Sequence, residues 1–244
     1  MEASLGITNL LNHAFAGPVD SLLGMVGVHP ADPAAPIDDT FSIELLVVLG
    51  FIVLFIWVRA SLSVEKPSPQ QHIAELLHEF IGGEAHTIIG HGYERFQPFV
   101  SCLFLFILAC NLLGLIPGIA PPTSAAVVPF GLAVTVFIYY NFYGVKDQGI
   151  IGYLKHFAGP VWWIAWLLFP IEIISNLARM MSLTIRLWAN MFAGDLVTLV
   201  FFSLIPIAIP ILFLALHVLV SLVQALVFTY LPMIYLGEAT HQEH

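Results

Sequence analysis

Long uninterrupted runs of apolar residues alternate with short polar segments along this chain. No Asp, Glu, Lys or Arg occurs from Phe96 to Val145, and none occurs from Leu196 to Gly237. A helix of about 20 apolar residues is long enough to cross a bilayer. The pattern therefore predicts an all-α polytopic membrane protein with about five crossing segments, at 41–58, 99–117, 124–143, 161–204 and 211–236.

The segments between these runs differ in character. Residues 71–89 mix polar and apolar positions, which is typical of an amphipathic helix lying at the membrane interface. Residues 1–40 contain Gly, Pro and five acidic residues and are predicted as an N-terminal extramembrane segment, ahead of a membrane-embedded domain at 41–244. Residues 144–160 are predicted as a loop.

The fourth apolar segment is too long for a simple crossing. From 161 to 204 its only strong helix breaker is Pro170. At 1.5 Å per residue such a helix is roughly 60 Å long, twice the thickness of the hydrocarbon core. The segment is therefore predicted to be either strongly tilted or broken. Pro206 and Pro210 mark a turn, after which 211–236 returns as the second arm of a long hairpin.

Composition and charge support this assignment and add an orientation. The chain is 59% hydrophobic and 9% charged, whereas soluble domains carry about 25% charged residues. Five of its seven Lys and Arg residues lie in 59–98 and 144–160, and none lies in 1–40 or 118–123. The positive-inside rule then places the N-terminus outside and the C-terminus in the cytoplasm. A net charge of −9 argues against a nucleic-acid partner.

One stripe of polar residues runs along the fourth apolar segment. Arg186 keeps its charge at any physiological pH, and placing an arginine at a bilayer centre costs about 2.5–3.5 kcal/mol or more. Glu172 and Arg179 precede it at steps of seven, so all three share one helix face. Asp195 lies about half a turn round the helix from Arg186. Three further polar residues fall on or beside the stripe: Ser175, Ser182 and Asn190.

The last apolar segment carries a second polar line, formed by His217, Ser221 and Gln224 at i, i+4 and i+7. If the two segments fold back antiparallel at Pro206, residues at equal depth can be matched along them. This match predicts that Arg186 lies level with Gln224, Asp195 with His217, and Glu172 with Glu238.

These two lines together indicate proton conduction. Asp195 and His217 carry groups that can exchange protons, and Glu172 and the serines provide polar positions at the other end of the stripe. Arg186 lies between them, cannot relay a proton and repels one electrostatically. Two polar half-paths separated by a fixed positive charge require a moving partner that carries an acidic group.

Other interpretations of the same residues remain open. Ser175 and Ser182 can bond the backbone of their own helix, Asn190 and Gln224 can link helices, and His217 can be a packed histidine. A self-contained channel or secondary transporter is an alternative function, although no duplicated halves are evident. A membrane metalloenzyme is another, although its candidate ligands follow no HExxH pattern: His72, His78, Glu79, His86 and His91.

Three motifs resemble one known family. SLTIRLWANMFAGDLV (182–197) closely resembles the arginine motif of subunit a of the F-type ATP synthase, and NLLGLIPG (111–118) resembles the signature of that family's second helix. The run from His217 to Gln224 and the closing TYLPMIYLGEATHQEH resemble its last helix. The resemblance extends over roughly residues 40–240.

The resemblance implies a proton-translocating stator subunit, with no enzyme activity of its own, in the bacterial inner membrane. Its implied partners are the c-subunit ring, the b-subunit peripheral stalk, the rest of the complex, the lipid bilayer and protons. Arg186 then faces the c-ring carboxylate. The implied outer half-channel contains Asn190, Asp195, His217, Ser221 and Gln224; the implied inner half-channel contains Glu172, Ser175, Arg179 and Ser182.

Asp195 departs from the Glu or His common at its position in the family, but it keeps a protonatable group. The chain contains no GxxxxGK[ST] loop, so direct nucleotide binding is not expected. No cofactor and no metal ion is expected either.

Overall fold

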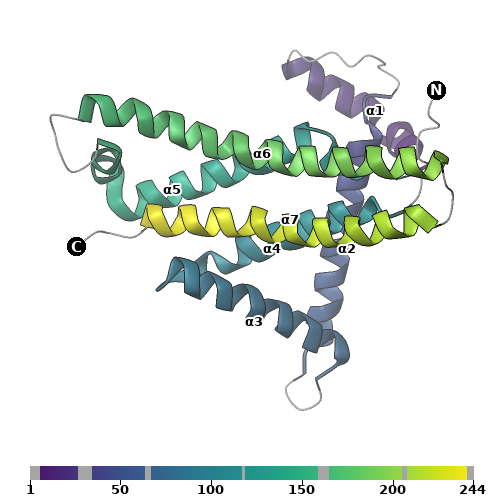
Figure 1. Ribbon diagram of the computed structural model, residues 1–244, viewed down its shortest axis with the longest axis horizontal. Coiled ribbons are helices and arrows are strands. Elements are labelled where there is room, and N and C mark those ends of the chain that lie inside the picture. Colours follow the sequence, from purple (N-terminus) through teal and green to yellow (C-terminus); the bar gives the residue numbers. More distant parts are fainter. Residues whose placement is uncertain are drawn as a thin grey trace. The chain divides into compact units, whose positions relative to one another are not determined.

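The computed structural model describes residues 6–26, 35–63, 67–116, 119–158, 165–204 and 208–240. All regular secondary structure in these ranges is helical (Figure 1), which confirms the predicted all-α membrane fold. The chain divides into two compact units, residues 1–60 and residues 61–244. Several predicted features lie outside the described residues: the last residue of the span 99–117, residues 161–164 of the fourth segment, and the turn at Pro206.

The first unit contains two helices, α1 (Gly6–Val26) and α2 (Asp39–Ala60). α2 covers the first predicted span and leaves most of its apolar side chains exposed, as expected for a helix that faces lipid. α1 lies within residues 1–40, where the sequence predicted no helix. Its glycines and Pro18 weaken the local helix signal, and contacts with the start of α2 support it instead.

The second unit packs five helices around one core (Figure 1). α4, α5, α6 and α7 contribute most of this core, and α3 packs against α4 and α7. On α6 the buried apolar residues are Leu183, Leu187 and Met191, spaced by four, so a narrow seam faces the core. The helices are α3 (Pro69–Ile89), α4 (Gln97–Leu113), α5 (Val127–Ala158), α6 (Ala165–Leu204) and α7 (Ala208–Thr240), with short 3₁₀ turns η1 (Tyr93–Arg95) and η2 (Pro122–Ser124).

Four of the described helices are long and apolar enough to cross a membrane: α2, α5, α6 and α7. α4 has 17 residues and is about 25 Å long at 1.5 Å per residue. The amides of Gly114, Leu115 and Ile116 donate hydrogen bonds to carbonyls three residues earlier, so turns of the 3₁₀ type extend the helix at its C-terminal end. α4 therefore has nearly the length of a bilayer core of about 30 Å.

α6 forms one unbroken helix of 40 residues through Pro170. The sequence left open whether this segment is tilted or broken, and the structure shows no break within Ala165–Leu204. A straight helix of this length measures roughly 60 Å, so it fits a bilayer only at a strong tilt or with its ends outside the hydrocarbon. α7, with 33 residues, is roughly 50 Å long and shares this requirement.

The loop predicted at 144–160 is wrong for the residues that are described. The chain stays helical to Ala158, with a single kink at Gly149, whose φ of 72° and ψ of 161° are not helical. After this kink the Tyr153 hydroxyl donates a hydrogen bond to the Oδ1 atom of Asn141, at 2.8 Å. The two lysines made this segment read as a loop, but a glycine turn lets a second helical piece pack back instead.

Gly149 occupies a region of φ and ψ that is essentially restricted to glycine. We expect Gly149→Ala to destabilise the assembled protein by about 1–3 kcal/mol, the usual cost of such strain. A lower midpoint of thermal unfolding in the purified complex would show this. Gly152→Ala is the matched control, because its new Cβ meets only ordinary contacts and alanine favours helix. Equal midpoints for the two variants would contradict the prediction.

Candidate functional site

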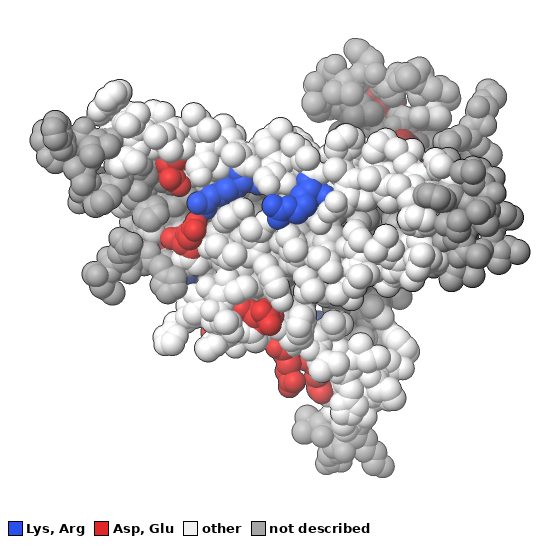
Figure 2. All heavy atoms as spheres, in the orientation of Figure 1, with Lys and Arg blue, Asp and Glu red and all other residues white. Residues whose placement is uncertain are grey.

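Arg186 lies partly buried on α6, close enough to Tyr235 on α7 for its charge to be felt there. Its Nη2 atom donates a hydrogen bond to the Ser182 hydroxyl one turn earlier, at 3.3 Å. Figure 2 shows two neighbouring groups of positive charge over α6 and α7; acidic atoms lie beside one of them, and other acidic atoms lie lower on the same face. Arg179 is the arginine with a carboxylate partner, Glu238. Arg186 therefore presents its charge without an ion-pair partner among the described residues.

One turn beyond Arg186, a hydrogen bond joins the two arms of the hairpin. The Asn190 amide Nδ2 donates to the Oε1 atom of Gln224, at 2.9 Å. Depth matching predicted Arg186 opposite Gln224, whereas the observed partner lies four residues further along α6. Side chains lean toward the N-terminus of their own helix, so contacting residues in an antiparallel pair lie further along each chain than their backbone depth indicates.

Further along α6, the two helices approach closely at His217. A Cβ atom on Gly194 would lie 3.1 Å from the His217 Nδ1 atom, so only glycine allows this contact without a shift. The buried His217 ring also interacts with the backbone of Asn111 on α4. Asp195 is half-buried and interacts with the Ser124 side chain on η2. The two predicted proton-exchanging groups thus contact η2 and α4 respectively, and no direct bond between them occurs in the described structure.

The end of α4 and the 3₁₀ turn η2 add residues that the sequence prediction missed. Asn111 and Thr123 are both fully buried, and the Thr123 hydroxyl donates to the Asn111 Oδ1 atom at 2.7 Å. Ser124, next in the chain, faces Asp195. The available signal was the uncharged polar residues in NLLGLIPG and the PPTS turn, which stand within otherwise apolar sequence.

Several buried polar atoms of this cluster have no hydrogen-bond partner within the described part of the chain. They are Asn111 Nδ2, His217 Nε2, Ser221 Oγ and Gln224 Nε2, together with Ser101 Oγ nearer the start of α4. A buried polar group without a partner costs about 1–3 kcal/mol, so such groups need an explanation. A row of unpaired donors and acceptors on α4 and α7 is chemically able to hold water and to pass protons.

Thr123 is expected to hold the Asn111 side chain in place. We expect Thr123→Val, which keeps the shape but removes the hydroxyl, to leave a buried amide oxygen unpaired at a cost of about 1–3 kcal/mol. Thermal unfolding of the purified complex would report this as a lower midpoint. In the control Thr135→Val, the lost hydroxyl bonds only the Gly131 carbonyl within the same exposed helix turn, so no comparable loss is expected. Equal losses would argue against a special role for Thr123.

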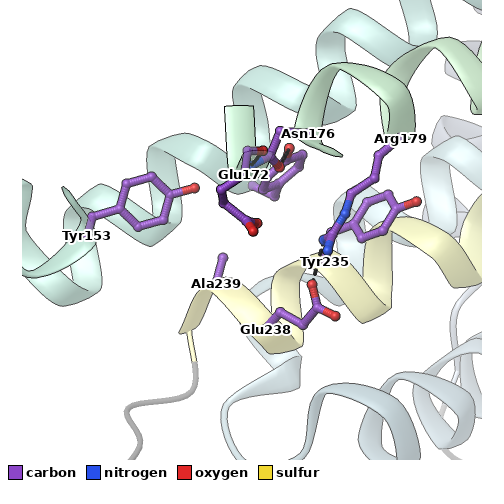
Figure 3. A pocket seen from close by; sticks show the side chains of 8 residues that line it. Tyr153, Glu172, Asn176, Arg179, Tyr235, Glu238 and Ala239 are labelled. Atoms are coloured by element: carbon purple, nitrogen blue, oxygen red, sulfur yellow. Dashed lines mark hydrogen bonds and ion pairs between the residues drawn. The ribbon is translucent and has the colours of Figure 1, made fainter. Parts of the chain in front are cut away.

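A pocket opens at the other end of the polar stripe, between α5, α6 and α7 (Figure 3). It holds about 280 Å³, counting its open mouth. The Glu172 carboxylate points into it toward α7, and Arg179 reaches across to Glu238 (Figure 3). The lining residues are Tyr140, Tyr153, Glu172, Asn176, Arg179, Tyr235, Glu238 and Ala239.

Hydrogen bonds and an ion pair order most of this lining. The Arg179 guanidinium forms an ion pair with Glu238 and lies over the Tyr235 ring, 4.9 Å from its centroid. The Tyr140 hydroxyl donates to the Asn176 Oδ1 atom at 2.6 Å. Arg179 thus has two acidic neighbours: Glu238, its ion-pair partner, and Glu172, which is close enough to interact with its charge.

The structure brings some predicted inner residues together and separates others. Glu172 and Arg179 line the pocket, whereas Ser175 and Ser182 lie elsewhere along α6. The other polar lining residues were missed, although depth matching had placed Glu238 near Glu172. They come from α5 and α7, and no spacing within one helix shows which tyrosines face a neighbouring helix.

The histidines of α3, considered above as metal ligands, each have a different neighbour. His72 lies 3.8 Å from the Glu75 carboxylate, and the His86 ring packs edge-on against Tyr93. The His78 Nδ1 atom lies 3.2 Å from the Gln97 amide nitrogen. Across the described residues, no group of three His, Cys, Asp or Glu side chains is placed to hold a metal ion.

Similarity to known proteins extends over most or all of the chain. The family described as ATP synthase A chain matches residues 41–237. The ATP synthase subunit a of Koribacter versatilis is 48% identical over 244 residues, covering all of both chains. That of Solibacter usitatus is 43% identical over 96% of this chain and 100% of its own, and that of Bdellovibrio bacteriovorus is 46% identical over 70% and 75%. The resemblance is thus confirmed, and the chain belongs to the ATP synthase subunit a family.

Proposed function

We propose that this chain is the proton-translocating stator subunit of a rotary F-type ATP synthase in a bacterial inner membrane. It is not an enzyme by itself and acts as a membrane subunit of the complex. The observation that carries the proposal is Arg186, a permanent charge on the α6–α7 seam without a carboxylate partner in the described chain. A polar cluster lies to one side of it along the seam, and a polar pocket lies to the other.

Arg186 has the role of facing the c-ring carboxylate. A positive charge in a low-dielectric seam favours the ionised form of a carboxylate brought close to it, and so drives proton release there. Asn190 and Ala193, which continue this face of α6, are exposed and short, so a partner helix can approach closely. Because Arg186 cannot give up a proton, it keeps the two half-paths separate.

The outer half-channel in this proposal contains Asn190, Asp195, His217, Ser221 and Gln224. The unpaired buried atoms on His217, Ser221 and Gln224 support it, because they form a polar line along α7 within an apolar core. We add Asn111, Thr123 and Ser124 to this half-channel. They connect the Asp195 and His217 sides of the cluster, which do not bond directly to one another.

The inner half-channel contains Glu172, Ser175, Arg179 and Ser182, and we place Glu238 with them. The open pocket at Glu172 supports this assignment, since it offers a carboxylate to protons that arrive from or leave to solvent. Glu238 forms the ion pair with Arg179, and the Glu172 carboxylate points into the pocket.

Two further parts of the proposal concern the assembly. The distribution of Lys and Arg places the N-terminus outside and the C-terminus in the cytoplasm, so α2 enters from the outer side. The partners are the c-subunit ring, the b-subunit peripheral stalk and the rest of the complex. Each proton that crosses couples about 2.3 kcal/mol per 100 mV of membrane potential, together with the pH difference.

Cysteine cross-linking to the c-subunit tests the proposal directly. One cysteine replaces Asn190 or Ala193, and a second lies beside the c-subunit's buried carboxylate, in native membranes with Cys102 and Cys110 replaced. We expect efficient cross-linking that stops ATP-driven proton pumping. Leu187→Cys and Phe192→Cys are the matched controls. Leu187 is fully buried against the core, and Phe192 is exposed on a different face of α6, so neither should cross-link.

Two outcomes would reject the proposed function. Equal cross-linking from Ala193, Leu187 and Phe192 would mean that the Arg186 face has no preferred partner. A chain that purifies alone and conducts protons in liposomes would instead be a self-contained channel.

A further inference from the structure

The N-terminal helix α1 lies outside the region matched by the family, and the structure anchors it to the start of α2. The Asn12 amide donates from Nδ2 to the Ile37 carbonyl at 2.9 Å, and its Oδ1 accepts from the Ile37 amide at 3.0 Å. The Thr8 hydroxyl bonds the carboxylate of Asp39, the first residue of α2. These bonds hold the first half of α1 at the point where α2 begins.

The residues of α1 fall on three distinct faces. Thr8 and Asn12, which are 2% and 8% exposed, form the face toward the start of α2. At about 100° per residue, Asn9, His13 and Asp20 share a second, polar face. The third face carries large apolar side chains that are exposed by about half or more: Ile7, Leu10 and Met25.

The occupant of the apolar face follows from what α1 is anchored to. α2 is an apolar membrane span of 22 residues whose exposed side chains are those of a helix in lipid. A helix anchored at the end of such a span is held at the level of the bilayer surface, where an apolar face can enter the interface. α1 has no Lys or Arg and one acidic residue, Asp20, so attraction to anionic headgroups cannot bind it there.

We propose that α1 is an interfacial helix that lies on the leaflet at the N-terminal end of α2 and inserts its apolar face into lipid. In the proposed orientation this is the outer leaflet. The contact is hydrophobic and insensitive to salt, since α1 offers no basic side chain. The inference does not depend on the proton path, because none of its residues belongs to α6 or α7.

Spin labels at single cysteines test this proposal in the whole complex, reconstituted in vesicles of neutral phospholipid with Cys102 and Cys110 replaced. Collisions with oxygen, which concentrates in lipid, are compared with collisions with a water-soluble nickel chelate. At Ile7→Cys and Leu10→Cys we expect oxygen collisions to exceed nickel collisions. At His13→Cys and Asp20→Cys, on the polar face of the same helix, we expect the order to reverse. High salt should leave both results unchanged.

Three results would overturn the proposal. Nickel collisions that dominate at Leu10 as they do at His13 would place the apolar face in water. Exclusion of both reagents at Ile7 and Leu10 would mean that a protein subunit covers this face. A pattern that disappears in high salt would indicate an electrostatic contact. ATP-driven pumping by the labelled complexes is measured in parallel, so a failure of this proposal remains separate from a failure of the proposed function.

Discussion

Arg186→Ala is expected to abolish ATP-driven proton pumping while the subunit still assembles. In the proposed function the substitution leaves the c-ring carboxylate without its opposite charge, and breaking a buried pair in this way costs about 3–5 kcal/mol. At the rate-limiting step this corresponds to at least roughly a 100-fold loss of coupled flux. The measurement is acidification of inverted membrane vesicles on ATP addition, together with the amount of subunit in the membrane. Assembly should persist, because the only side-chain bond that Arg186 makes in the described structure is to Ser182.

Arg179→Ala is the matched control for this prediction. It removes the same charge from the same helix stripe, seven residues earlier, but from an arginine already paired with Glu238. We expect this variant to pump more slowly yet remain coupled. Normal pumping by Arg186→Ala, or an equal loss in both variants, would contradict the special role of Arg186.

The sequence predicted much of the membrane fold because its signals are local. Apolar runs and their lengths predicted a helical polytopic protein, and a spacing of seven placed Glu172, Arg179 and Arg186 on one helix face. The inference from this spacing holds because α6 is one continuous helix from Ala165 to Leu204. The motif at 182–197 made the family assignment specific, because charged residues inside an apolar run are rare and mostly functional.

The features that the sequence did not predict depend on packing between distant segments. α1 is stabilised by Asn12 bonding the Ile37 backbone, a contact 25 residues away that no local propensity indicates. The helix after Gly149 forms because one glycine can turn the chain, whereas the two lysines of this segment had suggested a loop.

The sequence-based prediction of the polar residues around Arg186 was incomplete for the same reason. Tyr140, Tyr235 and Asn111 lie in apolar segments, where tyrosine and asparagine can also serve only to pack helices together. Their neighbours distinguish them: Asn176 for Tyr140, Arg179 for Tyr235 and Thr123 for Asn111. Those neighbours lie on other elements, so a periodicity argument within one helix cannot find them.

Asp195 provides the second large expected effect, because it is the protonatable group of α6 on the far side of Arg186 from the pocket. If it carries protons, Asp195→Asn should lower ATP-driven pumping at least about tenfold, since groups that transfer protons contribute roughly 10²–10⁴ in rate. Asn keeps the size of the side chain and its ability to bond Ser124, but it cannot take up and release a proton at neutral pH.

Two companion variants separate proton transfer from hydrogen bonding at this position. Asp195→Glu restores a carboxylate and should pump within about threefold of the wild type, a difference below 1 kcal/mol. Ser124→Ala removes the neighbouring hydroxyl and should have only a small effect, because the carboxylate remains. Vesicle acidification measured with equal amounts of assembled complex decides among them. Wild-type pumping by Asp195→Asn would contradict a proton-carrying role for Asp195 and leave it as a hydrogen-bonding residue only.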